Sequence, residues 1–232
     1  TLTLTGLTDT KLTSAEAAAF TQNYTASDAT SGVASTVAVV KNASQVVQST
    51  VLTTSGGQVK GDLSGLTDGT YTIEVTTTDY AGNVTTVISD PLVIDKTAPT
   101  LSVAGLNDTQ LSSSEVGTFK QYFIAADNTG GTGLVPTVAV VKNSTGVVQT
   151  LTVGSDANGT YVSGNLSGLA DGSYTVEVTA TDIAGNATKV TSDPFVIDAT
   201  KPTLTLAALT GGLSSDGKFT STEATNYSQE FT

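Results

Sequence analysis

Apolar and polar residues alternate with a period of two over most of the chain, and clusters of Gly, Asn, Asp and Ser interrupt the alternation. In the clearest segment Tyr71, Ile73 and Val75 fall on one face, and the polar residues between them fall on the other. This pattern predicts short, half-buried β-strands. One helical turn is predicted at Ala15–Ala19. The strands predicted in the first hundred residues lie near 1–7, 20–28, 36–42, 45–53, 58–64, 70–79 and 84–95.

The same series of elements occurs more than once. Thr1-Leu2-Thr3-Leu4 matches the segments that begin at Thr100 and Thr203, and Thr36–Asn42 returns as Thr137–Asn143. A period of about 100 residues with seven strands is the size of an immunoglobulin-like β-sandwich. The sequence therefore predicts an all-β chain of tandem Ig-like sandwiches. The predicted domains are residues 1–99, residues 100–202, and residues 203–232 as the first strands of an incomplete third repeat.

A tyrosine near the start of the sixth strand adds detail to this fold. Tyr71 follows an Asp68-Gly69 turn, and Tyr174 occupies the same position in the second copy. This placement is typical of the tyrosine corner of Ig-like domains, although a core tyrosine after a turn would give the same pattern.

Carboxylates fall where consecutive sandwiches would meet. A strand that runs down to Asp95 ends the first module, and the strands of the second module that climb end at Asp127 and Asp182. Asp95 is therefore expected to face Asp127 and Asp182 across the joint. The same reasoning places further acidic residues at the ends of the modules: Asp9, Glu16, Asp68, Asp28, Asp79, Asp108, Glu115, Asp171 and Asp198.

Calcium suits such a group, because it takes six to eight oxygen ligands and crowded carboxylates repel without a cation. The Asp9/Glu16 pair returns at the same spacing as Asp108/Glu115 and Asp216/Glu223. The sequence therefore predicts Ca²⁺ ligated by the twelve acidic residues named above. The other interpretation is that Asp-Gly and Asn-Gly are ordinary turns and that the acidic residues only solubilise the chain. Lys201 enters the second joint and is expected to weaken an ion there.

Two phrases give these joints a family resemblance. Thr-Asp-x-Ala-Gly-Asn occurs at 78–83 and 181–186, and Val-Ile-Asp-x-Thr-x-Pro begins at Val93 and again at Val196. Together they resemble the bacterial Ig-like repeats of giant surface adhesins. The resemblance implies extracellular β-sandwich arrays that bind calcium near domain boundaries and hold an adhesive tip away from the cell.

Composition excludes several other classes of function. The 232 residues include 21 acidic and nine basic residues, all nine of them Lys, and the net charge is −12. Nucleic-acid binding needs basic patches, and an apolar run of about 20 residues would be needed to span a membrane; the sequence has neither. It has no Cys or His, so the common nucleophile–base pairs of enzymes are absent and no enzyme activity is expected.

Nine of the ten Asn residues fit the Asn-x-Ser/Thr pattern of N-glycosylation. A chain rich in Ser and Thr produces some of these matches by chance, and repeat copying produces others. Glycosylation therefore stays a hypothesis beside that simpler explanation for Asn23, Asn42, Asn83, Asn107, Asn143, Asn158, Asn165, Asn186 and Asn226.

The predicted function is that of a structural extender in a cell-surface adhesin, with calcium stiffening the joints. Its expected partners are neighbouring repeats of a longer parent chain. The alternative is a subunit of an extracellular filament in which another chain completes residues 203–232. A ligand-binding module is less favoured, because the short loops lack the aromatic anchors expected of binding hot spots.

Overall fold

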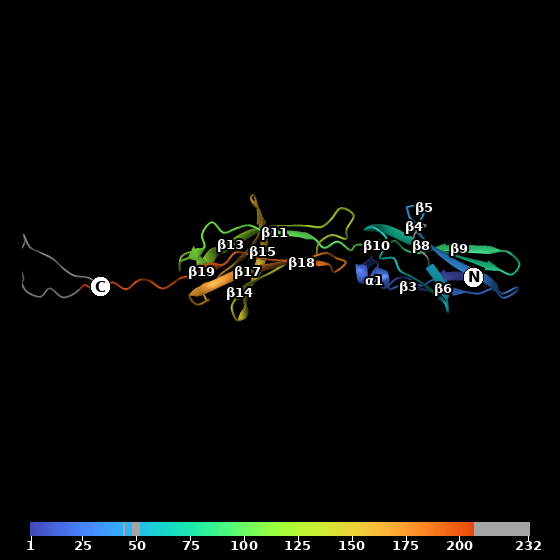
Figure 1. Cartoon of the computed structure of the whole chain (residues 1–232), viewed down its shortest axis with the longest axis horizontal. Helices are drawn as coiled ribbons and strands as arrows, with labels where there is room; N and C mark the ends of the chain where they lie inside the picture. The colour runs from blue at the N-terminus through green and yellow to red at the C-terminus, as the bar shows by residue number, and fades with distance from the viewer. Residues whose placement is uncertain (44, 48–51, 207–232) are drawn as a thin grey trace, which may run out of the picture.

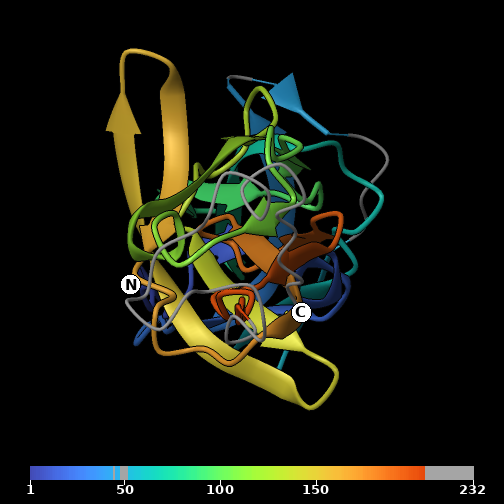
Figure 2. The ribbon, with the colours of Figure 1, turned by 90° about the vertical axis from the view of Figure 1, so that its left-hand side faces the viewer.

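The computed structural model describes residues 1–43, 45–47 and 52–206. Two β-sandwiches stand end to end along one long axis (Figure 1), and they overlap when viewed along that axis (Figure 2). The chain is all-β with tandem Ig-like domains, as the strand pattern predicts. The first sandwich occupies residues 2–94, and the second occupies residues 100–197.

The first module is built from two sheets. One has the order β1-β3-β7-β6, and the other has the order β2-β10-β8-β4-β5 with β9 also paired to β8. The pairs are antiparallel, except that β2 runs parallel to β10. The elements are β1 Leu2–Leu4, β2 Lys11–Leu12, α1 Ser14–Ala18, β3 Phe20–Ala26, β4 Val33–Asn42, β5 Gln45–Val46, β6 Leu52–Ser55, β7 Gln58–Gly61, β8 Gly69–Asp79, β9 Val84–Ile88 and β10 Leu92–Ile94.

The second module repeats this plan with one change. Its β15 is long enough to pair with both β14 and β16, so the two halves join into one sheet. In Figure 2 the hairpins at the two ends of β15 project to opposite sides. The elements are β11 Thr100–Val103, β12 Gln110–Leu111, η1 Val116–Thr118, β13 Phe119–Ala126, β14 Val138–Asn143, β15 Gly146–Asp156, β16 Gly159–Gly164, β17 Gly172–Thr181, β18 Ala187–Thr191 and β19 Phe195–Ile197.

Alternating side chains of the central strands form the two cores. Ile73 and Val75 of β8 are fully buried, as are Val176 and Val178 of β17, while their neighbours face outward. The Tyr71 hydroxyl donates a hydrogen bond to the carbonyl of Thr67 at 2.9 Å, and Tyr174 repeats the bond at 2.8 Å. The predicted tyrosine corner is therefore confirmed in both modules.

Several predicted strands are shorter than expected or divided. The strand expected at 84–95 is two strands, because Ser89 interrupts the ladder: its Oγ accepts the amide hydrogen of Ile73 and its amide donates to the Ile73 carbonyl. Pro91 follows and has no amide hydrogen to donate. The segment expected at 1–7 is a strand only at Leu2–Leu4, and the chain then crosses to the other sheet as β2.

The strand expected at 45–53 is also two strands, β5 and β6, and residues 48–51 between them lie outside the described residues. The strand expected at 58–64 ends at Gly61. The predicted helical turn is α1, which begins after Thr13. The Thr13 amide donates to Glu16 Oε2 at 2.9 Å, and the Glu16 amide donates to Thr13 Oγ1 at 3.4 Å, so the two residues form a capping box.

The predicted third repeat cannot be compared with the structure, because residues 207–232 lie outside the described part of the chain. The predicted boundaries at 99 and 202 stay predictions. Neither helix in the described residues has the length or the apolar character that crossing a bilayer requires.

Candidate metal centre at the joint between the modules

The joint is the place where loops of the second module contact the C-terminal end of the first. The Thr132 amide and hydroxyl donate to Asp95 Oδ2 at 2.7 and 2.8 Å. Asn186 Nδ2 donates to the Asp95 carbonyl at 2.9 Å, and Asn128 Nδ2 donates to Asp68 Oδ2 at 3.2 Å. Two loops of the second module therefore contact the first module, at Asp95 directly after β10 and at Asp68 directly before β8.

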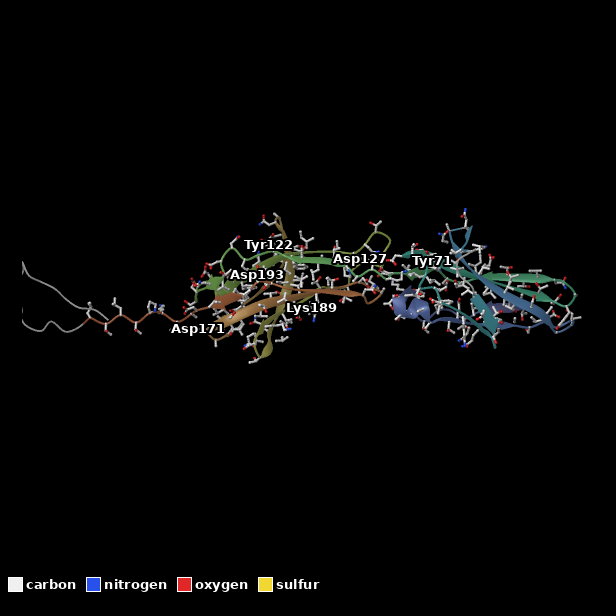
Figure 3. All side chains as sticks on the ribbon, viewed as in Figure 1. Tyr71, Tyr122, Asp127, Asp171, Lys189 and Asp193 are labelled. Atoms are coloured by element: carbon white, nitrogen blue, oxygen red, sulfur yellow. The ribbon has the colours of Figure 1, made fainter. Side chains whose placement is uncertain are left out.

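Three carboxylates converge at this joint from three separate segments. One oxygen each of Asp95, Asp127 and Asp182 lies within 4.8 Å of the other two. Asp95 follows β10, Asp127 follows β13, and Asp182 follows β17. Asp95 and Asp182 are 0% and 1% exposed, and Asp127 is half-buried. Figure 3 shows Asp127 at the boundary of the two modules.

A tight turn holds Asp182 in place. Its Oδ1 accepts the amide hydrogens of Gly185 and Asn186 at 2.7 and 2.8 Å, and its Oδ2 accepts from Asn186 Nδ2 at 2.8 Å. Gly185 has a φ of +106°, a conformation that residues with a Cβ rarely adopt. The Asp-x-Ala-Gly-Asn turn therefore fixes the position of its own aspartate side chain.

The loop from Asp127 to Gly133 supplies a second group of oxygens. Asp127 Oδ2 accepts from the Gly133 amide at 2.6 Å, and the Thr132 hydroxyl accepts from the Ala184 amide at 3.0 Å. A Cβ on Gly131 would stand 2.4 Å from Asn128 Oδ1 and 2.6 Å from Asp127 Oδ2. Two acceptor oxygens thus lie close to Gly131, and a side chain there would have to displace them.

Two buried oxygens at the joint have no hydrogen-bond donor. They are Asp95 Oδ1 and Asn128 Oδ1. A buried acceptor left without a partner costs roughly 1–3 kcal/mol, and more when it is charged. Carboxylate and amide oxygens of this kind are the ligands that a hard divalent cation prefers.

No lysine forms an ion pair with these three carboxylates among the residues that the structure describes. Their ion pairs join Lys41 to Glu74, Lys120 to Asp156, and Lys142 and Lys189 to Glu177. Lys96 is near the joint in sequence, but its Nζ donates to the carbonyls of Ser64 and Leu66. Two full charges 4.8 Å apart repel by roughly 3–4 kcal/mol at an effective dielectric constant of about 20.

Comparison with known families assigns both halves of the chain. Residues 3–96 and residues 97–199 match two different family models, each described as a bacterial Ig-like domain. The two modules are bacterial Ig-like domains. No curated protein matches the sequence.

Several solved structures are similar to parts of this chain. Fibronectin(III)-like modules of Clostridium thermocellum CbhA share 13% identity, covering 86% of this chain and 94% of that one, with a TM-score of 0.44. A Ca²⁺-stabilised adhesin that helps an Antarctic bacterium reach out and bind ice shares 22% (94% and 53%; TM-score 0.46). A 1.5-MDa bacterial ice-binding adhesin shares 20% (94% and 70%; TM-score 0.43).

The chain spans about half the length of the Antarctic structure. At these identities and TM-scores, the family assignment rests on the two family models.

The other nine predicted ligands do not join a group of three within the described residues. Several accept hydrogen bonds from their own loops: Asp9 and Asp108 accept the amide hydrogens of Lys11 and Gln110, and Glu16 and Glu115 accept those of Thr13 and Ser112. At the far ends of the two Ig-like domains lie Asp28, Asp79, Asp171 and Asp198; Figure 3 shows Asp171 at the end of the second domain opposite Asp127.

Asp68 is the exception among these nine, because it reaches the joint through its bond to Asn128. The sequence reasoning missed Asn128, Gly131 and Thr132. Their signal was the pair of residues by which this loop exceeds the Asp28–Gly32 loop of the first Ig-like domain. Asn186, one of the predicted glycosylation sites, donates both amide hydrogens within the joint.

Proposed function

We propose that the chain is an extender segment of a large bacterial surface adhesin. Calcium at the joint holds consecutive Ig-like domains in line, and the array keeps an adhesive region away from the cell. The family models and the sequence resemblance to adhesin repeats support the extender role. The cell surface is the proposed location.

The observation that carries the calcium proposal is the buried carboxylate triad shared by the two domains. Oxygens bound to one calcium ion at about 2.3–2.6 Å lie up to roughly 5 Å from one another. The 4.8 Å span of Asp95, Asp127 and Asp182 fits that limit. Asp95 Oδ1, which is buried and has no donor, supports the presence of a cation rather than a network of hydrogen bonds.

Because the ligands come from both domains, the ion acts on domain orientation. Without a cation the triad repels, and Asp95 is driven away from Asp127 and Asp182. With a cation the same charges hold the two domains together. Extracellular calcium modules have dissociation constants of about 10⁻⁴–10⁻³ M, and a tenfold excess of calcium over Kd stabilises the bound state by about 1.4 kcal/mol.

A stabilisation of this size is modest for folding but sufficient to favour one orientation of a joint. Small-angle X-ray scattering of the whole chain tests this distinction. With millimolar calcium we expect a longer maximum dimension and a narrower distribution of shapes than with a chelator, while the far-ultraviolet circular dichroism stays the same. Identical scattering curves in the two conditions would contradict the proposal.

The alternative function was a filament subunit completed by strands of another chain. It depends on residues 203–232, most of which lie outside the described residues, and no observation on the described residues favours it. Neither family model describes an enzyme.

A further inference from the structure

The joint contains one more oxygen that is placed to bind a cation. Resting on the proposed calcium joint, we infer that Asn128 supplies a fourth side-chain ligand through Oδ1 and that Asp68 orients it. The ligands would then be three carboxylates and one neutral amide oxygen.

Asn128 Oδ1 is buried and accepts no hydrogen bond. The other end of the same amide is held, because Asn128 Nδ2 donates to Asp68 Oδ2 at 3.2 Å. Rotating the amide by half a turn would place two oxygens, one from each residue, against each other. The direction of Oδ1 is therefore fixed by a carboxylate of the first domain.

Asn128 Oδ1 also lies beside a carboxylate of the triad. It and Asp127 Oδ2 both stand within 2.6 Å of the point where a Cβ on Gly131 would be. The two oxygens are therefore at most 5.0 Å apart (2.4 Å plus 2.6 Å), which is close enough for one calcium ion to contact both. Such an ion would give the buried Asn128 Oδ1 its missing partner.

The first domain has no counterpart of this ligand. The residue after Asp28 is Ala29, whereas the residue after Asp127 is Asn128. A larger set of oxygens with one neutral member suits Ca²⁺, which accepts six to eight ligands in flexible geometry. It suits Mg²⁺ less, because Mg²⁺ requires a near-ideal octahedron at about 2.0–2.1 Å.

Asp68 is a positioning residue in this scheme. Its Oδ1 accepts the Lys96 amide hydrogen at 3.1 Å, and its Oδ2 accepts from the Thr97 hydroxyl as well as from Asn128. Asp171 makes the same local bonds to Ala199 and Thr200 but lies at the other end of the second domain. Asp171 therefore offers a matched control.

Calorimetric titration of the whole chain with Ca²⁺, and separately with Mg²⁺, tests the inference. We expect Asn128→Ala to weaken calcium binding about tenfold, the low end of the 10–100-fold losses seen for groups around metal ligands. Asn128→Asp keeps an oxygen at the site but sets a second carboxylate oxygen against Asp68 Oδ2 in place of the Nδ2 donor, so we expect it to bind calcium more weakly than the unaltered chain. Preference for Ca²⁺ over Mg²⁺ should fall in Asn128→Ala.

A double-mutant cycle separates positioning from a general charge effect. Asp68→Asn is expected to weaken binding about as much as Asn128→Ala, and the double variant no more than either alone. Asp171→Asn should leave the affinity unchanged.

The outcomes distinguish this inference from the proposed function. If the unaltered chain binds no calcium, both fail. If it binds calcium and Asn128→Ala, folded by circular dichroism, binds with the same affinity, only the ligand role of Asn128 is overturned. Additive losses for Asp68→Asn and Asn128→Ala would overturn the positioning role of Asp68.

Discussion

The last strand of each domain ends in the same Val-Ile-Asp, yet the two aspartates have opposite environments. Asp95 is fully buried, and its side chain accepts two hydrogen bonds from Thr132 of the next domain. Asp198 is exposed, and the bond recorded for its side chain comes from the amide of Thr200, two residues away. The difference shows that the sequence phrase alone does not make a buried site, because the loops of a following domain must cover it.

The turns that follow β8 and β17, at the other end of each domain, lead to the same conclusion. Asp79 accepts from the Ala81 and Asn83 amides and from Asn83 Nδ2, and Asp182 is held by the same kind of turn. The turn of the first domain is uncovered, however, and Tyr80 is 76% exposed. Half of a joint is therefore pre-organised on each domain, and docking adds the other half.

The largest effect is expected from the two aspartates themselves. Asp95→Asn removes one of the three negative charges and replaces one carboxylate oxygen with an amide nitrogen, so we expect calcium affinity to fall at least about tenfold. The same change at Asp198 should leave the affinity of the joint between the two domains unchanged. Titration calorimetry measures both.

The Asp95→Asn variant is expected to behave differently when a chelator removes calcium. Asp95→Asn should then be as stable as the unaltered chain or more so, because one of three mutually repelling charges is gone. Equal calcium affinities for the Asp95 and Asp198 variants would remove the distinction between the covered and uncovered ends.

A smaller effect is expected from adding a side chain at Gly131. In Gly131→Ala the new Cβ would displace Asn128 Oδ1 and Asp127 Oδ2, at a cost of about 1–3 kcal/mol of stability for overpacking. Calcium affinity should fall as well. Gly105→Ala is the control, since a Cβ there meets no atom within 4 Å. Thermal unfolding with and without calcium compares the two variants. If Gly131→Ala unfolds at the same temperature as Gly105→Ala in both conditions, the loop at Gly131 is not crowded.

Substitutions in the cores of the two domains should have equal effects, because the cores do not contribute to the joint. Tyr71→Phe and Tyr174→Phe each remove a hydrogen bond to a carbonyl four residues upstream. Each change is expected to cost about 0.5–1.5 kcal/mol, similar in the two domains and independent of calcium. Urea unfolding of the whole chain measures these costs. A cost at Tyr71 that depends on calcium would mean that the corner and the joint are coupled.

The smallest effect concerns pH. Hydrogen bonds from Thr13 hold the pKa of Glu16 below its ordinary value, and Ser112 does the same for Glu115. A lowered folded-state pKa adds stability above the ordinary value near 4.5, and this stability is lost as the pH falls through the lowered pKa. Glu16→Gln and Glu115→Gln should flatten the fall in melting temperature below about pH 5. A decline as steep as that of the unaltered chain would show that other carboxylates dominate.

Much of this architecture could be predicted from the sequence, because it follows from local periodicity. The alternation around Ile73 indicates a half-buried strand, and the repeat offset indicates a second copy of the module. Strand direction then places Asp95 opposite Asp127 and Asp182, and the structure brings these three together.

The remainder depended on information that no local pattern carries. Ser89 divides a strand because its hydroxyl replaces a backbone acceptor, and a serine in a strand shows nothing of that bond beforehand. The spacing of Glu16 does not reveal the capping box that its carboxylate forms with Thr13, three residues away. Comparison of the two repeats shows that the loop at Asn128 is longer, but it does not single out Asn128, whose counterpart in the first domain is Ala29.

The parallel pairing of β2 with β10 has a mechanical consequence. The chain enters each domain at one end and leaves it at the other, so tension applied to the two ends of a domain would pull these two strands in opposite directions past each other. Their hydrogen bonds, and those of β12 with β19, are then loaded together in shear rather than opened one after another. A domain tethered in this way resists stretching through the same short strands that close its sheet.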